Sequence, residues 1–475
     1  MTVNQKTIRA ELEDYLKKNY ITINQFAEVS GVNSGTLSSF INGNRSISIP
    51  KLDHITEGMG LKEGTFYDLY VDECFTHPSL NWRRLRPLLY RCAELDKLDC
   101  IGRLLEMMTN NLSYTPLLFD IAEDLFKQGQ RAAAALLYER VAESEKYQHS
   151  ERLALCQYRL FILALCKDHA KNLRAALRFE GFVGRLDEMD QLDAMKDLAN
   201  TYLTLHMWDK MDKVAKRMER LANIHYKYRY EQSRKEEFHK DPTMPLFAYI
   251  LYAHILCSSV CVERGDYDLG LQYVSLYSDM SWVREDTEES HRLMNQCKMW
   301  AKANSYLIRL MKGEIEVLPE YVAYIEQYEE EILLALFMIL QIANRNQFNV
   351  DDILLRFEHQ IPEFKARQGE EGRYTPLVIE DRYAHFMAEL TLYYMNRGEY
   401  EKGMKYMLAG LESALKINSK ICIIRYVGLF EQFRYAASLE SQIIYKNLIC
   451  NVQNNNLAVS NLLIMESDSD NYTYS

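Results

Sequence analysis

Glycine and proline are scarce in this chain of 475 residues, which has only 19 glycines and 9 prolines. Sheet-rich and loop-rich proteins need more of both, because these two residues form most tight turns. No long stretch alternates apolar and polar residues with the period of two that marks a half-buried strand. The sequence therefore predicts an all-α protein.

Long apolar segments are also missing. The longest unbroken apolar run, residues 332–340, is far shorter than the ~20 residues that span a bilayer. The chain begins MTVNQKTIRAEL, without the apolar stretch of a secretory signal. These two absences predict a soluble, cytoplasmic protein that has no membrane partner.

No catalytic or metal-binding pattern is visible. The 10 cysteines form no CxxC pair, and Cys257 and Cys261 lie among apolar residues, which indicates buried thiols rather than a zinc site or disulfides. GxGxxG, P-loop, HExxH and GxSxG motifs are missing. Isolated histidines on apolar helices, such as His206 and His254, are more often core residues than ligands. We therefore expect no enzyme activity, no metal site and no cofactor.

The chain is too long for a single hydrophobic core, and its first 75 residues form a distinct pattern of five short helices. The helical pattern stops at Gly31, which can adopt a positive φ, and resumes after Asn33, which can cap a helix. Two short helices joined by such a turn make a helix-turn-helix. The second helix, residues 33–42, has one apolar stripe and otherwise short polar side chains, as entry into a DNA major groove requires.

Candidate DNA contacts follow from this arrangement, because short polar side chains bond base edges or phosphates and cations bind phosphates. They are Gln25, Asn33, Ser34, Thr36, Ser38, Ser39, Asn42, Arg45 and Lys51. Residues 1–75 carry seven Lys or Arg and ten Asp or Glu, a net charge of −3, and the whole chain carries −11. One module should therefore bind DNA weakly, so we expect a homodimer that places two recognition helices about one DNA turn apart. The alternative is that this helical bundle binds only proteins.

Residues 76–450 show helical periodicity almost throughout. At Gly129, Gly265 and Gly398 a helix ends and, after two residues, another begins that carries a small and then an aromatic residue. These glycines are 136 and 133 residues apart, close to four times the 34-residue period of the tetratricopeptide repeats that the pattern resembles. We expect a right-handed superhelix of about eight to ten helical hairpins with a concave groove, followed by a helix remnant and polar tail at 451–475.

Asparagine within apolar helices is the candidate ligand contact of this region. A side-chain amide can both donate to and accept from the backbone of an extended peptide, whereas asparagine has poor helix preference. The candidates are Asn200, Asn295, Asn304 and Asn344. Solvent exposure or an inter-helix hydrogen bond is the alternative. We attribute most of the 33 tyrosines to packing between helices.

The segment ITINQFAEVSGVNSGTLSSFINGNRSISIPKLDHITEGMGL resembles the helix-turn-helix of the phage repressor and Xre family. Gly31, Thr36 and Gly43 lie in the register of that family. Two positions depart from it: Ile23 replaces a glutamine that supports phosphate binding, and Ser39 replaces a common arginine. Base contacts can therefore not be copied from the family.

An Xre-type module followed by tetratricopeptide-like repeats resembles the peptide-sensing regulators of Gram-positive bacteria and their phages, which include quorum-sensing factors and arbitrium receptors. In that family the concave helical face binds a short imported peptide, which alters dimer geometry and DNA affinity. The resemblance implies a dimeric transcriptional regulator that binds double-stranded DNA through residues 1–75 and a short oligopeptide through residues 76–450. The alternatives are a regulator whose repeats bind a protein partner and a cytosolic adaptor that binds only proteins.

Overall fold

The computed structural model describes residues 7–75, 82–108, 112–231, 240–328, 332–361 and 376–450. Within these ranges the protein is all-helical and has no strand, so the predicted fold class is confirmed. The helix remnant and tail predicted at residues 451–475 lie outside the described residues.

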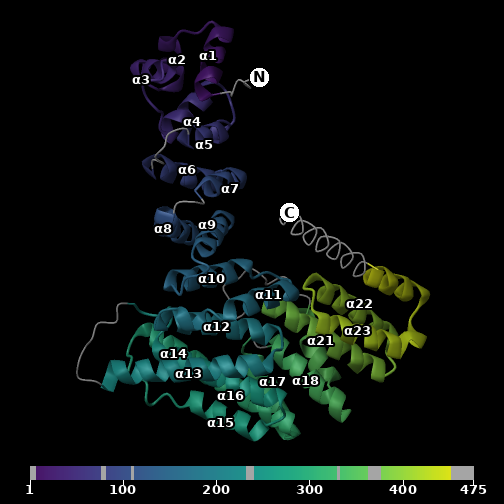
Figure 1. The fold of residues 1–475 in the computed structure, drawn as a ribbon. Coiled ribbons are helices and arrows are strands. Elements are labelled where there is room, and N and C mark those ends of the chain that lie inside the picture. Colours follow the sequence, from purple (N-terminus) through teal and green to yellow (C-terminus); the bar gives the residue numbers. More distant parts are fainter. Residues whose placement is uncertain are drawn as a thin grey trace, which may run out of the picture. The chain divides into compact units, whose positions relative to one another are not determined.

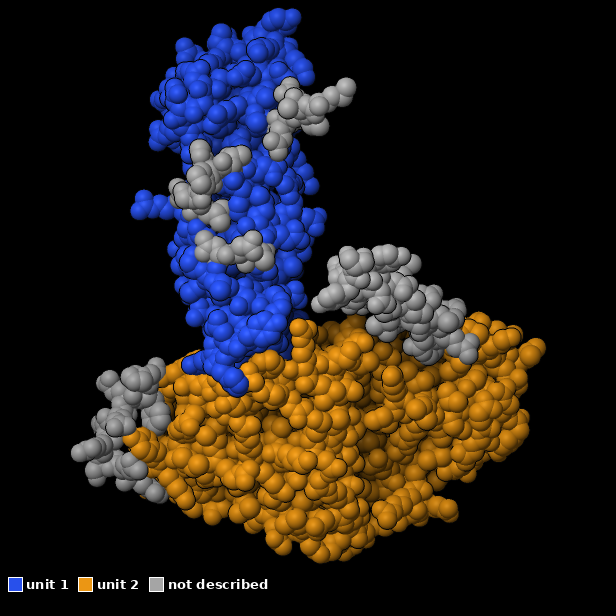
Figure 2. Space-filling model, viewed as in Figure 1, with its two compact units in different colours: residues 1–163 blue, residues 164–475 orange. Residues whose placement is uncertain are grey.

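The chain folds into two compact units, Met1–Leu163 (unit 1) and Ala164–Ser475 (unit 2), shown in Figure 2. The sequence predicts a division at residue 75, but the first 75 residues belong to the same unit as the helices that follow them. Helix α5 packs on α6 and α7, and Arg84 of α6 donates to the Tyr70 hydroxyl of α5 at 3.2 Å. The predicted DNA-reading module is therefore the first part of a larger body.

The five helices predicted for residues 1–75 are present. They are α1 (Ile8–Asn19), α2 (Ile23–Ser30), α3 (Ser34–Ile41), α4 (Ile49–Gly58) and α5 (Tyr67–Phe75). Gly31 ends α2 with a φ of 67°, and the Asn33 side chain accepts from the Gly35 N–H to cap α3, as the sequence predicts. Phe26, Leu37 and Phe40 are each 1% exposed and fix α2 and α3 to a common core.

The rest of unit 1 continues as packed helices. They are α6 (Trp82–Glu94), α7 (Leu98–Met107), α8 (Thr115–Lys127), α9 (Arg131–Ser144) and α10 (Glu151–Ala164), which ends at the border of the units.

Unit 2 consists of successive helix pairs (Figure 1). Its main helices are α11 (His169–Glu180), α12 (Glu188–Thr204), α13 (Trp208–Glu231), α14 (Leu246–Glu263), α15 (Tyr267–Ser278), α16 (Glu288–Lys312), α17 (Leu318–Ile325), α18 (Ile332–Asn346), α19 (Asp351–Arg356), α21 (Pro376–Asn396), α22 (Tyr400–Lys416) and α23 (Lys420–Phe433). Residues 439–450 form a further helix.

The three predicted glycine turns each join two helices that pack on one another. Gly129, Gly265 and Gly398 have φ values of 78°, 76° and 80° and connect α8 to α9, α14 to α15 and α21 to α22. The same left-handed conformation recurs in other turns at residues with side chains, at His206 (φ 53°) before α13 and Asn418 (φ 51°) before α23. The left-handed conformation thus recurs in the turns between helices, but the residue that adopts it is glycine in only some of these turns.

The helical array of unit 2 closes on itself. Helix α12 packs on α21, although most of unit 2 separates them in the sequence. The His169 N–H donates to the Ile417 carbonyl at 2.9 Å, and the Asn418 amide donates to Asp168 at 3.2 Å, across 250 residues. The predicted superhelix has an open groove, whereas in the structure the first and last parts of the array meet.

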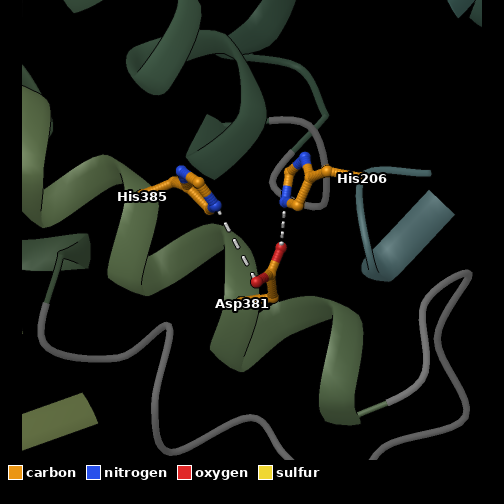
Figure 3. A group of neighbouring side chains, drawn as sticks. All are labelled: His206, Asp381 and His385. Atoms are coloured by element: carbon orange, nitrogen blue, oxygen red, sulfur yellow. Dashed lines mark hydrogen bonds and ion pairs between the residues drawn. The ribbon is translucent and has the colours of Figure 1, made fainter. Parts of the chain in front are cut away.

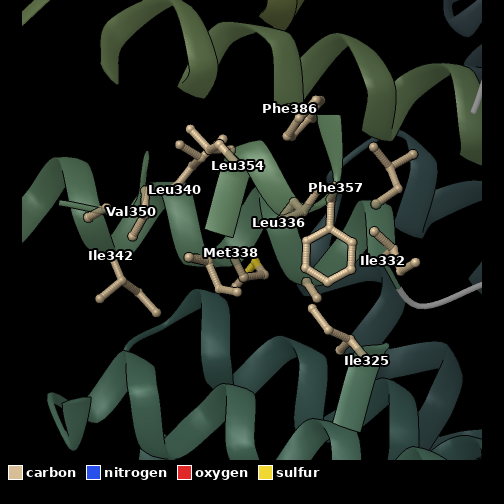
Figure 4. Close-up of a cluster of buried hydrophobic side chains, with 14 of the residues drawn as sticks. Ile325, Ile332, Leu336, Met338, Leu340, Ile342, Val350, Leu354, Phe357 and Phe386 are labelled. Atoms are coloured by element: carbon tan, nitrogen blue, oxygen red, sulfur yellow. The ribbon is translucent and has the colours of Figure 1, made fainter. Parts of the chain in front are cut away.

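The apolar run at residues 332–340 fills the middle of unit 2. It forms most of α18, which packs between α16 and α21. Leu336 and Leu340 are fully buried there together with Phe357 and Phe386 (Figure 4). The length of this run therefore reflects burial on almost every side of the helix.

Helix α14 is, among the described residues, the one helix long and apolar enough to cross a membrane. A count of unbroken apolar runs misses it because His254 and Ser258 interrupt the run. In the structure 83% of the helix is buried inside unit 2, which is compatible with a soluble protein.

Candidate functional site

The first candidate surface is formed by the polar side of α3. Ser34, Thr36, Ser38 and Ser39 are half-buried, and Asn42 at the end of the helix is exposed. Their short side chains leave the backbone of α3 open to close approach, as a helix inserted in a groove needs.

Several predicted DNA contacts have structural roles in the free protein. Gln25 accepts from the Thr22 N–H at 2.9 Å and Asn33 accepts from the Gly35 N–H at 2.9 Å, so both side chains help to start a helix. Arg45 is exposed and Lys51 is half-buried, and neither forms an ion pair within the described residues. These two cations remain available to phosphates.

The charge around α3 differs from the average charge of residues 1–75. Residues 29–52 contain no Asp or Glu and hold both Arg45 and Lys51. Four of the ten carboxylates of residues 1–75 are paired with arginines of α6 and α7. The pairs join Asp53 and Glu63 to Arg91, and Asp68 and Asp72 to Arg103. The net charge of −3 therefore overstates the repulsion that DNA would meet at α3.

The second candidate surface is a cavity of about 380 Å³ inside unit 2. It is lined by α12, α14, α16, α18, α21 and α23, together with His206 of the turn after α12 and Trp208 at the start of α13. Because the array closes, these helices face one small space. The residues that line it are far apart in the sequence, the first being Leu203 and the last Arg425.

The cavity combines an apolar wall with a limited set of polar groups. Leu307, Phe337 and Met338 are among its apolar side chains. The polar ones are Thr204, His206, Ser258, Ser259, Glu263, Asn304, Gln341, Asp381, Arg382, His385 and Arg425. A surface that combines apolar side chains with convergent polar groups is typical of sites that bind small ligands.

Only one of the four predicted asparagines lines the cavity. Asn304 of α16 does so, and its amide donates to the Tyr277 hydroxyl at 2.8 Å. Asn295 lies about two and a half turns earlier on the same helix and is exposed. Asn304 thus stays a predicted ligand contact that lines the cavity, whereas Asn295 does not line it.

The other two asparagines form inter-helix hydrogen bonds, the alternative that the sequence leaves open. Asn200 of α12 accepts from the Tyr252 hydroxyl of α14. Asn344 of α18 donates to Glu389 of α21 at 2.8 Å, and the same carboxylate binds Arg425 at 2.6 Å. Asn344 therefore does not line the cavity. It holds the Glu389 carboxylate, which in turn binds Arg425, a residue that does line it.

Three histidines surround one buried carboxylate at the cavity wall, and Figure 3 shows two of them, His206 and His385. Asp381 of α21 is 4% exposed. Its Oδ2 lies 3.2 Å from Nε2 of His206, and its Oδ1 lies 3.9 Å from Nε2 of His385 and 3.6 Å from Nε2 of His169. The rings of His206 and His385 are 4.6 Å apart. His206, Asp381 and His385 line the cavity itself.

Burial and the shared carboxylate set the protonation of this group. Burial opposes ionisation of Asp381, but the His206 hydrogen bond and the other imidazoles hold the pKa of the carboxyl below its usual value. Burial lowers the pKa of His385 to about 4. For His206 burial also acts downward, yet the bond to Asp381 prevails and raises its pKa. Near neutral pH, Asp381 is thus a carboxylate and His385 a neutral imidazole.

The sequence gives little warning of this cluster. His206 and Asp381 are 175 residues apart and meet only because the array closes. One local signal exists, since Asp381 and His385 lie four residues apart and share one face of α21. The prediction that His206 is an isolated core histidine is wrong, because it lines the cavity beside two other ionisable groups.

Comparison with known proteins gave no match: no family model matches the chain, and no curated protein matches its sequence. The two candidate surfaces are therefore defined by their own residues and geometry.

Proposed function

We propose that the protein is a DNA-binding transcriptional regulator. In this proposal α2 and α3 form a helix-turn-helix, α3 enters the DNA major groove, and two copies of the chain bind together. The cavity of unit 2 binds a short signalling peptide that changes the dimer geometry and the DNA affinity. The observation that carries the proposal is the short, polar and carboxylate-free surface of α3 and its following turn.

Cations flank this surface where phosphates would lie. Arg45 follows α3 in the next turn, and Arg9 of α1 lies over the Phe40 ring of α3, 5.5 Å from its centroid. A recognition helix contacts bases with its polar side while neighbouring cations and N–H groups hold the backbone. The arrangement thus offers both kinds of contact within one small region.

A DNA-binding experiment on the full chain tests this proposal. Fragments from the chain's own genomic neighbourhood are titrated with protein at several salt concentrations, with fluorescence anisotropy as the readout. We expect sequence-dependent binding that weakens steeply with salt. Equally weak binding to every fragment, up to micromolar concentrations of dimer, would rule out the regulator and favour the alternative of an adaptor that binds only proteins.

Arg45→Ala is expected to weaken DNA binding without changing its sequence preference. Loss of one phosphate contact should lower the salt-dependence slope by about 1 per protomer. Lys127→Ala is the matched control, because Lys127 is also exposed in unit 1 but belongs to α8. Equal salt slopes for the two variants would show that Arg45 does not contact phosphate.

Exposed apolar side chains near the end of the described chain support a homodimer. Ile424 of α23 is 72% exposed, and Leu439 and Ile443 of the next helix are 75% and 53% exposed. The two helices are held together by Phe430 and Tyr445, whose rings stack at 3.6 Å. Leu439 and Ile443 lie four residues apart on one face of their helix, and exposed apolar groups of this kind are typical of an interface between proteins.

Leu439→Glu combined with Ile443→Glu is expected to dissociate this dimer. Two carboxylates in an apolar interface should raise the dimer dissociation constant by at least ~10-fold, since each loses hydration without gaining a partner. Sedimentation velocity measures the result. Leu355→Glu is the control, because Leu355 is 71% exposed but lies on α19; dissociation by this variant as well would argue against a specific interface.

The cavity favours a short peptide over a whole protein as the ligand. Its volume of about 380 Å³ lies within the range of small-ligand pockets, and side chains of seven helices line it. Two amide side chains, Asn304 and Gln341, line it and can bond to peptide groups. Calorimetry with candidate peptides, using Asn304→Ala against Asn295→Ala, separates a cavity contact from an exposed asparagine on the same helix.

A further inference from the structure

We propose that His206, Asp381 and His385 bind a divalent transition-metal ion, with Zn²⁺ as the best match, at the wall of the unit 2 cavity. This site adds to the proposed function and does not depend on it, because its ligands all lie in unit 2 and involve no DNA contact.

The spacing of the three side chains fits one metal ion. Each residue offers one ligand atom, and these atoms all lie within 4.8 Å of one another. Tetrahedral Zn²⁺ with bonds of about 2.0–2.1 Å holds its ligand atoms about 3.3 Å apart. The distances from Asp381 to His206 and His385, 3.2 and 3.9 Å, are already close to that value. The two imidazole rings both point toward the Asp381 carboxylate (Figure 3).

Unpaired buried atoms give independent support. Oδ1 of Asp381 and Nε2 of His385 are both buried and have no hydrogen-bond partner. Buried polar atoms are rarely left in this condition, and a metal ion or an ordered water usually explains the exceptions. A single metal ion would bind both atoms, and two nitrogens with one carboxylate are donors that Zn²⁺ accepts.

The backbone at His206 also favours a special role for its side chain. The turn before α13 has the left-handed conformation that Gly129, Gly265 and Gly398 adopt in the equivalent turns. A side chain in that conformation carries strain, and such residues gather at functional sites. Here the residue with the side chain is the one that reaches Asp381.

His169 lies beside the site without being one of its ligands. Its Nε2 is 3.6 Å from Oδ1 of Asp381, but it is not one of the three residues whose ligand atoms lie mutually close. Nε2 of His169 is also buried and has no hydrogen-bond partner among the residues that the structure describes.

A metal at this position would have two consequences. It would join the turn after α12 to α21, and so fasten the contact that closes the array. Three protein ligands leave a fourth position for water or an anionic ligand atom, and all three ligands line the cavity. A carboxylate of a bound ligand is the group that would complete such a site.

Metal titration of the full-length chain tests the proposal. The protein is stripped with a chelator and titrated with Co²⁺, because tetrahedral Co²⁺ absorbs visible light with an intensity that depends on its ligands. We expect one Co²⁺ per chain, displacement of Co²⁺ by Zn²⁺, and a higher unfolding temperature with metal than without. Absence of stoichiometric binding by either metal would overturn the proposal and leave a hydrogen-bonded cluster only.

Three variants locate the ion. His206→Gly removes one imidazole at a position whose φ suits glycine, so the fold should be kept. His206→Gly and His385→Ala are each expected to weaken Zn²⁺ binding by at least ~100-fold, the upper limit for loss of an outer partner. His254→Ala is the control, because His254 is a buried histidine of unit 2 paired with one carboxylate, Glu219, at 3.1 Å.

Unfolding of the metal-free variants shows whether each is folded. Equal Zn²⁺ affinity in His206→Gly, His385→Ala and the control would place the metal elsewhere and overturn the assignment. DNA binding is measured separately on the same samples, so failure of the metal site and failure of the proposed regulator remain distinguishable.

Discussion

Gly410→Ala is expected to destabilise unit 2 by about 3 kcal/mol, the upper part of the range for overpacked cores. A methyl group on Gly410 of α22 would overlap with Oη and Cζ of Tyr426 and lie 2.9 Å from its Cε1. Tyr426 of α23 is fully buried, and its hydroxyl donates to the Ala384 carbonyl of α21 at 2.6 Å. The ring therefore has no free space, and the helices must separate. Urea unfolding followed by circular dichroism measures the loss.

Gly428→Ala is the matched control for this change. Gly428 lies on α23 with no heavy atom within 4 Å of an added Cβ, so alanine should be neutral or stabilise the helix by up to ~1 kcal/mol. Tyr426→Ala removes all three side-chain atoms that the new methyl group would meet. The double variant Gly410→Ala/Tyr426→Ala should therefore be more stable than the sum of its parts by at least ~1 kcal/mol. Additive losses would mean that the two residues do not collide.

Ser38→Glu is expected to reduce DNA affinity by at least ~100-fold. A carboxylate placed opposite phosphates makes the binding free energy less favourable by several kcal/mol, because like charges repel. Ser38 lies in the middle of α3, within the stretch of residues 29–52 that has no carboxylate. Anisotropy titration at low and moderate salt measures the effect. Ser39→Arg at the neighbouring position should act in the opposite direction and strengthen binding.

Gln128→Glu introduces the same charge at an exposed residue that follows α8 of unit 1 and should leave the affinity within about threefold of the parent. This comparison separates a local effect at α3 from a change in net charge. If Ser38→Glu and Gln128→Glu bind DNA equally well, α3 is not the DNA-binding surface, whatever the rest of the chain does.

The helices and turns of this protein are predictable where their signals are local. Gly31 and Asn33 fix the turn between α2 and α3 through a positive φ and a side-chain cap, and both features are predictable from the residue type. The turns at Gly129, Gly265 and Gly398 are legible for the same reason. In each case neighbouring residues determine the backbone.

The cavity is not predictable in this way, because it depends on which helices meet. An asparagine in an apolar helix has the same local pattern whether it faces a ligand, as the position of Asn304 allows, or another helix, as Asn344 does. The histidine cluster likewise requires that residues 206 and 381 come together, and no periodicity encodes a contact across 175 residues. The local sequence pattern therefore predicts where the helices are. Which of their residues line the cavity depends on how the helices pack in the closed array.

Closure of the array also constrains how the chain can fold. In an open stack of repeats each hairpin contacts only its neighbours, so folding can begin at any repeat and spread along the chain. Here the hydrogen bond of Asp168 cannot form until Asn418, 250 residues later in the chain, has been synthesised. At about 5–20 residues per second, synthesis from α12 to the end of α21 takes roughly 10–40 s. During that interval the inner face of α12 has no partner, which makes a ribosome-bound fragment of this protein a natural client for chaperones.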